Sequence, residues 1–375
     1  MLKIILDISP AIVNRTAVHH MVLDLGEQLA TTFDLELSVC GKIESHGQSP
    51  KKLIQNLTEK QRSTLFKRII NHTERACKAQ DIEYFPALDY EVKPTLYLDA
   101  LFTPIKTGPA SRDIVVIHDL TPLTHPQWHR PEISRAYHQA FLRVAASGCT
   151  IVSDSQSTTD ELRFHLGVDP DRICTLPLYL RRQQANLLQM GQPKSKDKFL
   201  LFVGSLELRK NIIGLFRSFA YSKLHEKGYS LLIVGMDGNG AEDIRHEAER
   251  TSGVSLLGFV SEERLSRLYA DCEAFVYPSF WEGFGMPLLE AMARSCLCIS
   301  TMTGASPEVG GDAVIYVDPC DPISITAGLL TVHEMEENAR QLLKRLAEKR
   351  ATSFTAEKYV DDFTNLIHRH ASKIA

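Results

Sequence analysis

Two glutamates separated by seven residues, Glu282 and Glu290, flank a glycine-containing segment. Pro287 suits the first turn of a helix, so the residues before it are expected to form a loop at the helix amino end. That loop consists of Gly283, Phe284 and Gly285. Free N–H groups at such an end favour a phosphate or a developing negative charge. The two carboxylates can accept hydrogen bonds from sugar or ribose hydroxyls. The alternative is that Glu290 is a solvated helix residue and that Gly283 and Gly285 only shape a turn.

A second pattern combines two cations with the end of a strand. Residues 201–211 (LFVGSLELRKN) predict a strand, a Gly-Ser turn, and then Arg209 and Lys210 ahead of a helix. Cations in that position can neutralise a leaving diphosphate. The alternative is a solvated loop that carries two ordinary surface cations.

Both patterns resemble those of one family. Residues 278–293 (PSFWEGFGMPLLEAMA) resemble the E-x7-E signature of retaining glycosyltransferase family 4 (glycosyl transferases group 1), and the likeness continues through 307–319. Residues 201–211 resemble the family's diphosphate site, although Ser205 stands where the family often has arginine. The resemblance implies an α/β chain of the GT-B type, in which two Rossmann-like parallel-sheet domains face a cleft.

The resemblance also implies roles for individual residues. Glu282 and His118 would hold the sugar, and Asp119 would border the reaction centre. The diphosphate would lie against Arg209, Lys210, Gly283, Phe284 and Gly285. The nucleotide would lie against Glu290, Gly235, Phe259, Val260 and Ser205.

His118 and Asp119 belong to residues 114–122 (IVVIHDLTP), which look like the family's V-H-D-x-x-P segment at the end of a buried strand. A histidine there can equally be a satisfied structural residue. The segment that follows the next strand supplies further candidates to line the cleft, namely Asp154, Ser155 and Ser157.

Two segments depart from the family pattern. Residues 12–20 replace the usual glycine-rich loop after the first strand, and 176–180 (LPLYL) replace the usual P-N-G-V-D. Side chains that would substitute for the loop on the acceptor side are Asn14, Arg15, His19 and His20. These departures keep two alternatives open: a non-catalytic GT-B partner subunit, and an enzyme of the sugar-nucleotide epimerase type.

The alternation of apolar runs with helical stretches predicts the elements that must position these residues. Strands are expected at 3–7, 35–40, 114–118, 150–153 and 172–176, and then at 199–203, 230–234, 254–257, 274–277, 298–301 and 314–317. Helical stretches are expected at about 322–349 and 355–370. A polar linker at 181–198 separates an acceptor-side domain, 1–185 with the helix at about 355–375, from a nucleotide-sugar-binding domain at 195–350.

Composition limits the partners. A net charge of -4 argues against nucleic acid. The first eight residues read as a strand and not as a signal peptide, and the eight cysteines form no C-x-x-C pair, so a cytoplasmic protein is expected. Residues 51–78 form a basic amphipathic stretch, which predicts either a core-facing helix or peripheral contact with the inner face of a membrane.

A metal site is not expected, and no cofactor is expected besides the substrates. His118, His125 and His129 are close in sequence, but two prolines interrupt the helix that would align them. Asp169 and Asp171 form a D-x-D pair in a helix-to-strand turn, where turn chemistry is the simpler explanation.

The function implied by the resemblance is hexosyl transfer with retention, in surface polysaccharide assembly. The donor is a nucleoside diphosphate sugar, with GDP-mannose as the first choice and a UDP-sugar as the second. The acceptor is a saccharide or a lipid-linked saccharide.

Overall fold

The protein was analysed as a computed structural model, which describes residues 2–13, 17–78, 93–180 and 197–374. The chain divides into two compact units. The first consists of Met1–Pro177 and Glu357–Ala375, and the second of Leu178–Ala356. Most of the linker predicted at 181–198 lies outside the described residues.

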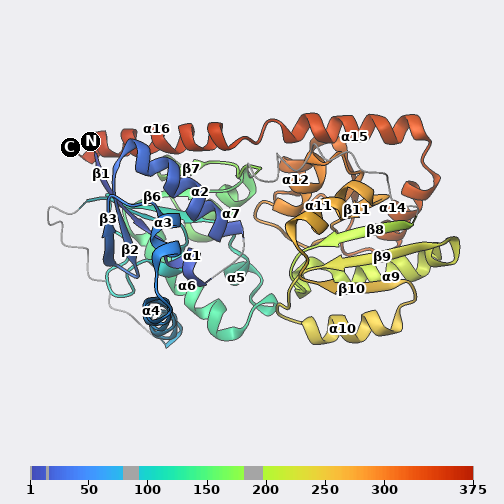
Figure 1. Cartoon of the computed structure of the whole chain (residues 1–375), viewed down its shortest axis with the longest axis horizontal. Coiled ribbons are helices and arrows are strands. Elements are labelled where there is room, and N and C mark those ends of the chain that lie inside the picture. Colours follow the sequence, from blue (N-terminus) through green and yellow to red (C-terminus); the bar gives the residue numbers. More distant parts are fainter. Residues whose placement is uncertain (1, 14–16, 79–92, 181–196, 375) are drawn as a thin grey trace. The chain divides into compact units, whose positions relative to one another are not determined.

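The first unit is built on a seven-stranded sheet (Figure 1). Its order is β3 (Lys42–His46), β2 (Asp34–Val39), β1 (Lys3–Asp7), β4 (Thr95–Tyr97), β5 (Ile114–Ile117), β6 (Thr150–Ser153) and β7 (Ile173–Thr175). All neighbours are parallel except β2 and β3, which form an antiparallel hairpin. Sequence patterning missed β3, a polar edge strand, and β4, which has only three residues.

The helices of the first unit cover this sheet and connect its strands. They are α1 (Ser9–Val13), α2 (Ala17–Thr32), α3 (Pro50–Asn56), α4 (Glu59–Lys78), η1 (Ala100–Phe102), α5 (Thr121–Thr124), η2 (Pro126–Trp128), α6 (Pro131–Ala146), α7 (Gln156–Leu166) and η3 (Pro170–Arg172). The fully buried strand residues Val115 and Ile151 pack in one core with Phe141 and Val144 of α6. Burial of these apolar side chains supplies the main force that holds the layers together.

A further helix of the first unit comes from the far end of the sequence. α16 (Ala356–Ile374) runs beside the first unit in Figure 1. His370 makes hydrogen bonds of 2.8 Å with Oγ1 of Thr150 and 2.7 Å with the carbonyl of Arg112. The hydroxyl of Tyr359 lies 3.6 Å from the sulfur of Met21.

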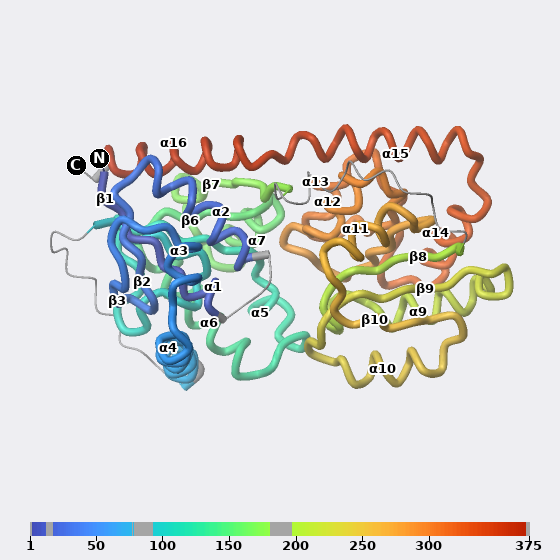
Figure 2. Tube along the Cα trace, viewed as in Figure 1, coloured from blue at the N-terminus to red at the C-terminus, as the bar shows by residue number. Residues whose placement is uncertain are grey.

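The second unit contains a six-stranded sheet in which all neighbours are parallel. Its order is β10 (Val254–Gly258), β9 (Tyr229–Val234), β8 (Lys198–Val203), β11 (Ala274–Val276), β12 (Cys298–Thr301) and β13 (Val314–Val317). All six correspond to predicted strands. The prediction of two Rossmann-like parallel-sheet domains is therefore confirmed, and the tube in Figure 2 shows the repeated passage from strand to helix to strand.

The helices of the second unit are η5 (Leu208–Lys210), α9 (Ile212–Ser222), η6 (Leu224–Lys227), α10 (Ala241–Arg250), α11 (Glu262–Asp271), α12 (Met286–Ala293), α13 (Ser306–Gly310), η7 (Gly311–Ala313), α14 (Pro322–Glu334) and α15 (Glu337–Ala351). The single helical stretch predicted over 322–349 was wrong, because the chain becomes extended at Met335. No glycine or proline marks that break in the sequence. Within the part of the chain that the structure describes, no helix has the length and apolar character to cross a bilayer.

Candidate functional site

The charged residues predicted in the second unit meet at the carboxyl ends of two neighbouring strands. β8 and β11 are adjacent in the sheet, and the segments that follow them are 204–210 and 277–285. Parallel strands bring such segments to the same edge of a sheet, which is where ligands of open α/β sheets usually bind.

Glu282 is the centre of this group. Its Oε2 accepts a hydrogen bond of 2.9 Å from Nη1 of Arg209, and its Oε1 accepts one of 2.9 Å from Nζ of Lys210. Burial alone would raise the pKa of Glu282, but Arg209 and Lys210 hold that pKa at about 2. Glu282 is therefore a carboxylate at neutral pH and is unsuited to the role of a general acid.

Lys210 is buried inside the group. Its Nζ also donates to the hydroxyl of Tyr277 at 2.7 Å and lies 5.0 Å from the centre of that ring. Burial, followed by the positive charge of Arg209, lowers the pKa of Lys210. Because the Lys210 side chain is only 6% exposed and that of Arg209 is 17% exposed, Arg209 is the cation that a ligand reaches more readily.

Arg209 is held by a second carboxylate that the sequence analysis did not single out. Its Nε donates to Oε2 of Glu207 at 2.7 Å, and the Ser205 hydroxyl donates to Oε1 of Glu207 at 2.5 Å. Burial would raise the pKa of Glu207, but Arg209 and Lys210 lower it below the ordinary range. The Ser205 hydroxyl therefore hydrogen-bonds to Glu207 in this structure, whereas Ser205 was predicted to contact the nucleotide. In the sequence, the only sign of this Glu207–Arg209 contact is that Glu207 lies two residues before Arg209.

The loop before α12 has the conformation that the sequence predicted. Gly285 precedes the helix with a φ of 93°, which only glycine adopts easily. The Phe284 side chain is buried, and its ring lies 5.8 Å from that of Phe354. Phe284 can therefore offer a ligand only its backbone.

Glu290 belongs to a neighbouring group on α12 and α11. Its Oε2 accepts a hydrogen bond of 3.3 Å from the hydroxyl of Tyr269, a residue that the sequence analysis missed. The guanidinium of Arg294 lies 5.0 Å from the centre of the Tyr269 ring and donates to the Glu290 carbonyl at 3.0 Å. Burial and then the charge of Glu290 raise the pKa of Tyr269 well above its ordinary value, so this phenol remains a hydrogen-bond donor.

Three predicted nucleotide residues lie at the same edge of this sheet. A Cβ on Gly235 would lie 1.8 Å from the carbonyl oxygen of Gly204, so glycine is required where these two loops meet. Phe259, which follows β10, is 76% exposed, whereas Val260 is 6% exposed. The exposed Phe259 ring is therefore available for stacking, and Val260 is available through its backbone.

In the first unit, His118 follows β5 and is engaged at both ring nitrogens. Nδ1 lies 2.6 Å from Oδ2 of Asp154, and Nε2 lies 2.9 Å from the carbonyl of Leu98. Burial would lower the pKa of His118, but Asp154 and Asp99 raise it to about 9, so the ring is an imidazolium at neutral pH. We expected this ring to hydrogen-bond a sugar hydroxyl, but the structure directs both nitrogens to the protein itself.

Asp119 and Ser155 stabilise local backbone. Oδ1 of Asp119 accepts from the backbone N–H and the hydroxyl of Thr121, at 2.9 and 2.6 Å. The Ser155 hydroxyl caps α7 by accepting from the N–H of Thr158 at 3.1 Å, and Ser157 lies in the first turn of that helix.

The predicted acceptor-side residues divide into two groups. Asn14 and Arg15 lie outside the described residues. His19 and His20 lie in the first turn of α2. Nδ1 of His19 is 2.7 Å from the Ala11 carbonyl, and the two imidazole rings meet edge to face at 5.0 Å.

The residues that the sequence offered as candidate metal ligands contact other protein groups instead. Oδ1 of Asp169 accepts from the N–H of Asp171 at 3.0 Å, which confirms the predicted turn. The His125 ring stacks on Trp128 at 4.1 Å, and His129 is 3.0 Å from the Thr121 hydroxyl. Within 2–13, 17–78, 93–180 and 197–374, no three His, Cys, Asp or Glu residues are grouped to hold a metal.

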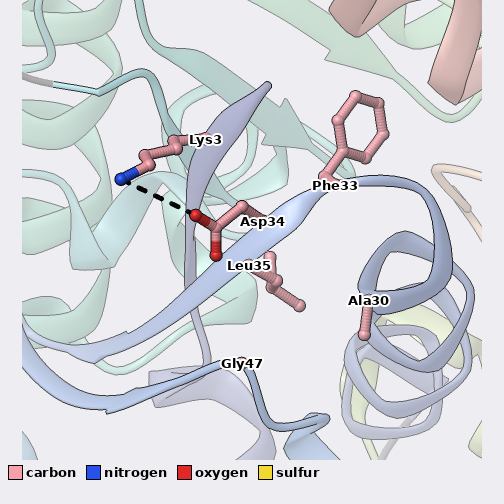
Figure 3. Close-up of a pocket in the computed structure, with 6 residues that line it drawn as sticks. All are labelled: Lys3, Ala30, Phe33, Asp34, Leu35 and Gly47. Carbon is pink, nitrogen blue, oxygen red and sulfur yellow. Dashed lines mark ion pairs between the residues drawn. The ribbon is translucent and has the colours of Figure 1, made fainter. Parts of the chain in front are cut away.

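A separate pocket of about 430 Å³ lies in the first unit at the amino ends of β1 and β2 (Figure 3). Its ion pair joins Lys3 and Asp34 at 3.8 Å, and the side chains are 60% and 44% exposed. The other lining residues are Ala30, Phe33, Leu35 and Gly47. This edge of the sheet is opposite the one that carries His118.

Comparison with known proteins shows that the charged group of the second unit lies in a segment that matches a family model. Residues 184–350 match the family model for glycosyl transferases group 1. This segment is a group 1 glycosyltransferase domain. It contains Ser205, Arg209, Lys210, Gly235, Phe259, Val260, Glu282 and Glu290.

Curated relatives of the chain include O-antigen mannosyltransferases. The chain is 31% identical over 232 residues to O-antigen chain mannosyltransferase B of Escherichia coli, which covers 58% of this chain and 60% of the relative. It is 26% identical over 227 residues to O-antigen chain mannosyltransferase RfbU of Salmonella typhimurium, which covers 60% of this chain and 61% of the relative. The chain therefore spans about three fifths of the length of these two relatives.

Solved structures extend the likeness of the fold over both units. Sucrose-phosphate synthase from Thermosynechococcus elongatus has a TM-score of 0.68 at 16% identity and covers all of both chains. WaaG, a glycosyltransferase involved in lipopolysaccharide biosynthesis, has a TM-score of 0.67 at 14% identity, with 98% of this chain and 99% of the other covered. The group 1 domain and the first unit together therefore have the GT-B fold.

Proposed function

We propose that this protein is a retaining glycosyltransferase that moves a hexose from a nucleoside diphosphate sugar to a saccharide or lipid-linked saccharide. One observation carries the proposal: a group 1 domain holds the Glu282 carboxylate between Arg209 and Lys210 at the carboxyl edge of its sheet. This arrangement supports the proposal, because fixed positive charge can stabilise a departing diphosphate and a neighbouring carboxylate can accept hydrogen bonds from sugar hydroxyls.

The proposed reaction uses no nucleophile from the protein. The bond between the anomeric carbon and the β-phosphate oxygen breaks, and its electron pair remains on the diphosphate. The acceptor hydroxyl attacks the anomeric carbon from the same face, and its proton passes to an oxygen of the departing diphosphate. The anomeric configuration is therefore retained.

The residues of the second unit would stabilise this charge separation. Arg209, the more exposed cation, would contact the departing phosphate, and Glu207 would fix the direction of its guanidinium. Lys210 would act indirectly, because its hydrogen bond keeps Glu282 ionised and oriented. The N–H groups at the start of α12 would add positive potential.

The donor proposed first is GDP-mannose, with a UDP-sugar second. The similarity to O-antigen mannosyltransferases supports mannose and an acceptor of surface polysaccharide assembly. Glu290 would hold the ribose, and the exposed Phe259 ring would lie against the base.

A panel of nucleotide sugars tests the proposal. Slow release of nucleoside diphosphate from one donor, followed by a glycosidic product whose anomeric proton shows retention by NMR, is the expected result. Nucleotide binding without turnover would indicate a non-catalytic partner subunit. Sugar-nucleotide isomerisation without a glycosidic bond would indicate an enzyme of the epimerase type.

We also propose that the reaction needs no divalent metal, because Arg209 and Lys210 supply the neutralising charge. EDTA should leave the transfer rate nearly unchanged. Inhibition by EDTA that added Mn²⁺ or Mg²⁺ reverses would contradict this part of the proposal.

Peripheral membrane contact through residues 51–78 remains a proposal. Lys51, Lys52 and Lys60 are exposed on α3 and α4 and can lie against anionic lipids. Binding to vesicles of phosphatidylcholine and phosphatidylglycerol should fall as salt rises, and the triple Lys→Gln variant should bind more weakly. Equal sedimentation of the wild type with neutral and anionic vesicles would refute it.

A further inference from the structure

A larger pocket, of about 850 Å³, opens in the first unit at the carboxyl edge of its sheet. Three segments form its walls: Cys40 and Gly41 after β2, one face of α4, and the loop at 102–107 after β4. It therefore lies at the same edge as His118, and at the opposite edge from the pocket beside Lys3.

The lining is strongly basic. It includes Lys67, Arg68, Arg75 and Lys106, and it includes no carboxylate. Arg68 is ion-paired with Glu44. In the described parts of the chain, the other three cations have no acidic partner, so their charge is available to an anion.

The geometry of α4 places its pocket-lining residues on one side of the helix. Lys67, Asn71 and Arg75 follow one another at intervals of four residues, which places them on one face of a helix. His72 contributes a neutral ring, because burial lowers its pKa and its Nε2 lies 3.0 Å from the Leu101 carbonyl. Two ammonium groups, a guanidinium and an amide are the donors that recognise phosphate oxygens.

Part of the remaining lining is apolar. Phe102, Pro104 and Ile105 form part of the wall. An anion that also carries an organic group fits this mixture better than a free inorganic ion does.

Hydrogen bonds link the pocket wall to the segments that carry two predicted site residues, His19 and His118. The N–H of Cys40 donates to the Ser9 hydroxyl at 2.9 Å, which joins the pocket wall to the chain segment that leads to His19. The loop after β4 contacts His118 through the Leu98 carbonyl and reaches the pocket four residues later, at Phe102.

We propose that this pocket binds the phosphate or diphosphate group of a phosphorylated acceptor. The binding site is inferred from its charge and shape alone. Its assignment to the acceptor rests on the proposed glycosyl transfer. The acceptor would then be a phosphate ester whose organic part lies against Phe102 and Ile105.

Calorimetric titration with inorganic pyrophosphate tests the site. The titration uses the Arg209→Ala background, which removes the exposed phosphate-binding cation of the second unit. In that background, Lys67→Gln with Arg75→Gln should weaken pyrophosphate binding at least about tenfold, because two charge-assisted contacts are lost. Lys60→Gln with Lys52→Gln is the matched control, because Lys60 lies on α4 and Lys52 on the preceding α3, and neither lines the pocket. This control should keep the background affinity.

Equal affinity in the pocket variant and its control would overturn the proposal. Loss of binding to anionic vesicles in the pocket variant, with no pyrophosphate binding by its parent protein, would also overturn it, because the cations would then serve a lipid surface. The readout does not depend on turnover. If no sugar donor reacts, the proposed function fails while the anion site still stands.

Discussion

Lys210 and Glu282 form a hydrogen bond of 2.9 Å between two residues that are each only 5% exposed. A charged pair this deeply buried couples the chemistry of the site to the stability of the unit. A substitution of Glu282 is therefore expected to change the unfolding midpoint as well as the activity.

Glu282→Gln should abolish most transfer and also lower the stability of the second unit. The variant leaves Arg209 and Lys210 without their shared anion, and breaking a buried ion pair from one side costs about 3 to 5 kcal/mol. Urea unfolding of the variant measures this cost. Glu263→Gln on α11 is the control, because its carboxylate pairs with Arg267 at the surface and is 61% exposed. Wild-type stability in Glu282→Gln would contradict the burial of the pair.

Acid should destabilise the wild type through the same carboxylate. The pKa of Glu282 is lowered from 4.5 to about 2 in the folded protein, so its contribution is complete above about pH 4.5 and is lost as the pH falls toward 2. The contribution is on the order of 3 kcal/mol. Unfolding free energies measured across this range should fall less steeply for Glu282→Gln. Parallel curves for the two proteins would exclude Glu282 as the titrating group.

Arg209→Ala should mainly reduce activity, whereas Lys210→Ala should reduce both activity and stability. Loss of the more exposed Arg209 should reduce kcat/KM by roughly 10- to 150-fold with a loss in kcat, because its contact to phosphate strengthens as the bond breaks. Lys210→Ala should reduce activity and also lower the unfolding midpoint, since it removes the buried donor to Oε1 of Glu282 and to the hydroxyl of Tyr277. Lys210→Arg should rescue only in part, because a planar group does not replace a compact ammonium. Identical stability of the two alanine variants would argue against this division.

Alkaline pH should reveal the His118–Asp154 pair. The pKa of His118 is raised from 6.5 to about 9, so its stabilising charge is complete below pH 6.5 and is lost as the pH rises through 9. Asp154→Asn should bring the pKa of His118 down, and NMR titration of the ring would record the change. Asp160→Asn on the exposed face of α7 serves as the control. An unchanged His118 titration in Asp154→Asn would refute the pairing.

Tyr269→Phe should weaken donor binding with little change in the chemical step. The Tyr269 hydroxyl donates to Glu290, so its loss leaves the proposed ribose-binding carboxylate less well oriented. We expect the donor KM to rise roughly 5- to 15-fold, in line with the loss of one hydrogen bond, while kcat stays within about twofold. Glu290→Ala should have a larger effect in the same direction. A fall in kcat at constant KM would place Tyr269 elsewhere in the mechanism.

The sequence predicted the parallel sheets well because buried strands such as 199–203 are short apolar runs bounded by turns. It did not predict the partners of the charged residues. Glu207 lies only two residues from Arg209, but that spacing does not show which way its carboxylate points. Tyr269 gains its role from a contact with Glu290, 21 residues later, that only the fold brings together. The same limit applies to His118, whose strand position was predicted correctly but whose two hydrogen-bond partners lie 20 and 36 residues earlier and later in the chain.

The position of α16 has a consequence for how the protein is made. The first unit contains Met1–Pro177 and also Glu357–Ala375, so the ribosome synthesises all of Leu178–Ala356 before the last helix of the first unit emerges. Until then, the surface that receives the buried side chains of Tyr359, Phe363 and Ile367 remains exposed to water. The unit that begins synthesis first is therefore the one that can complete its folding last.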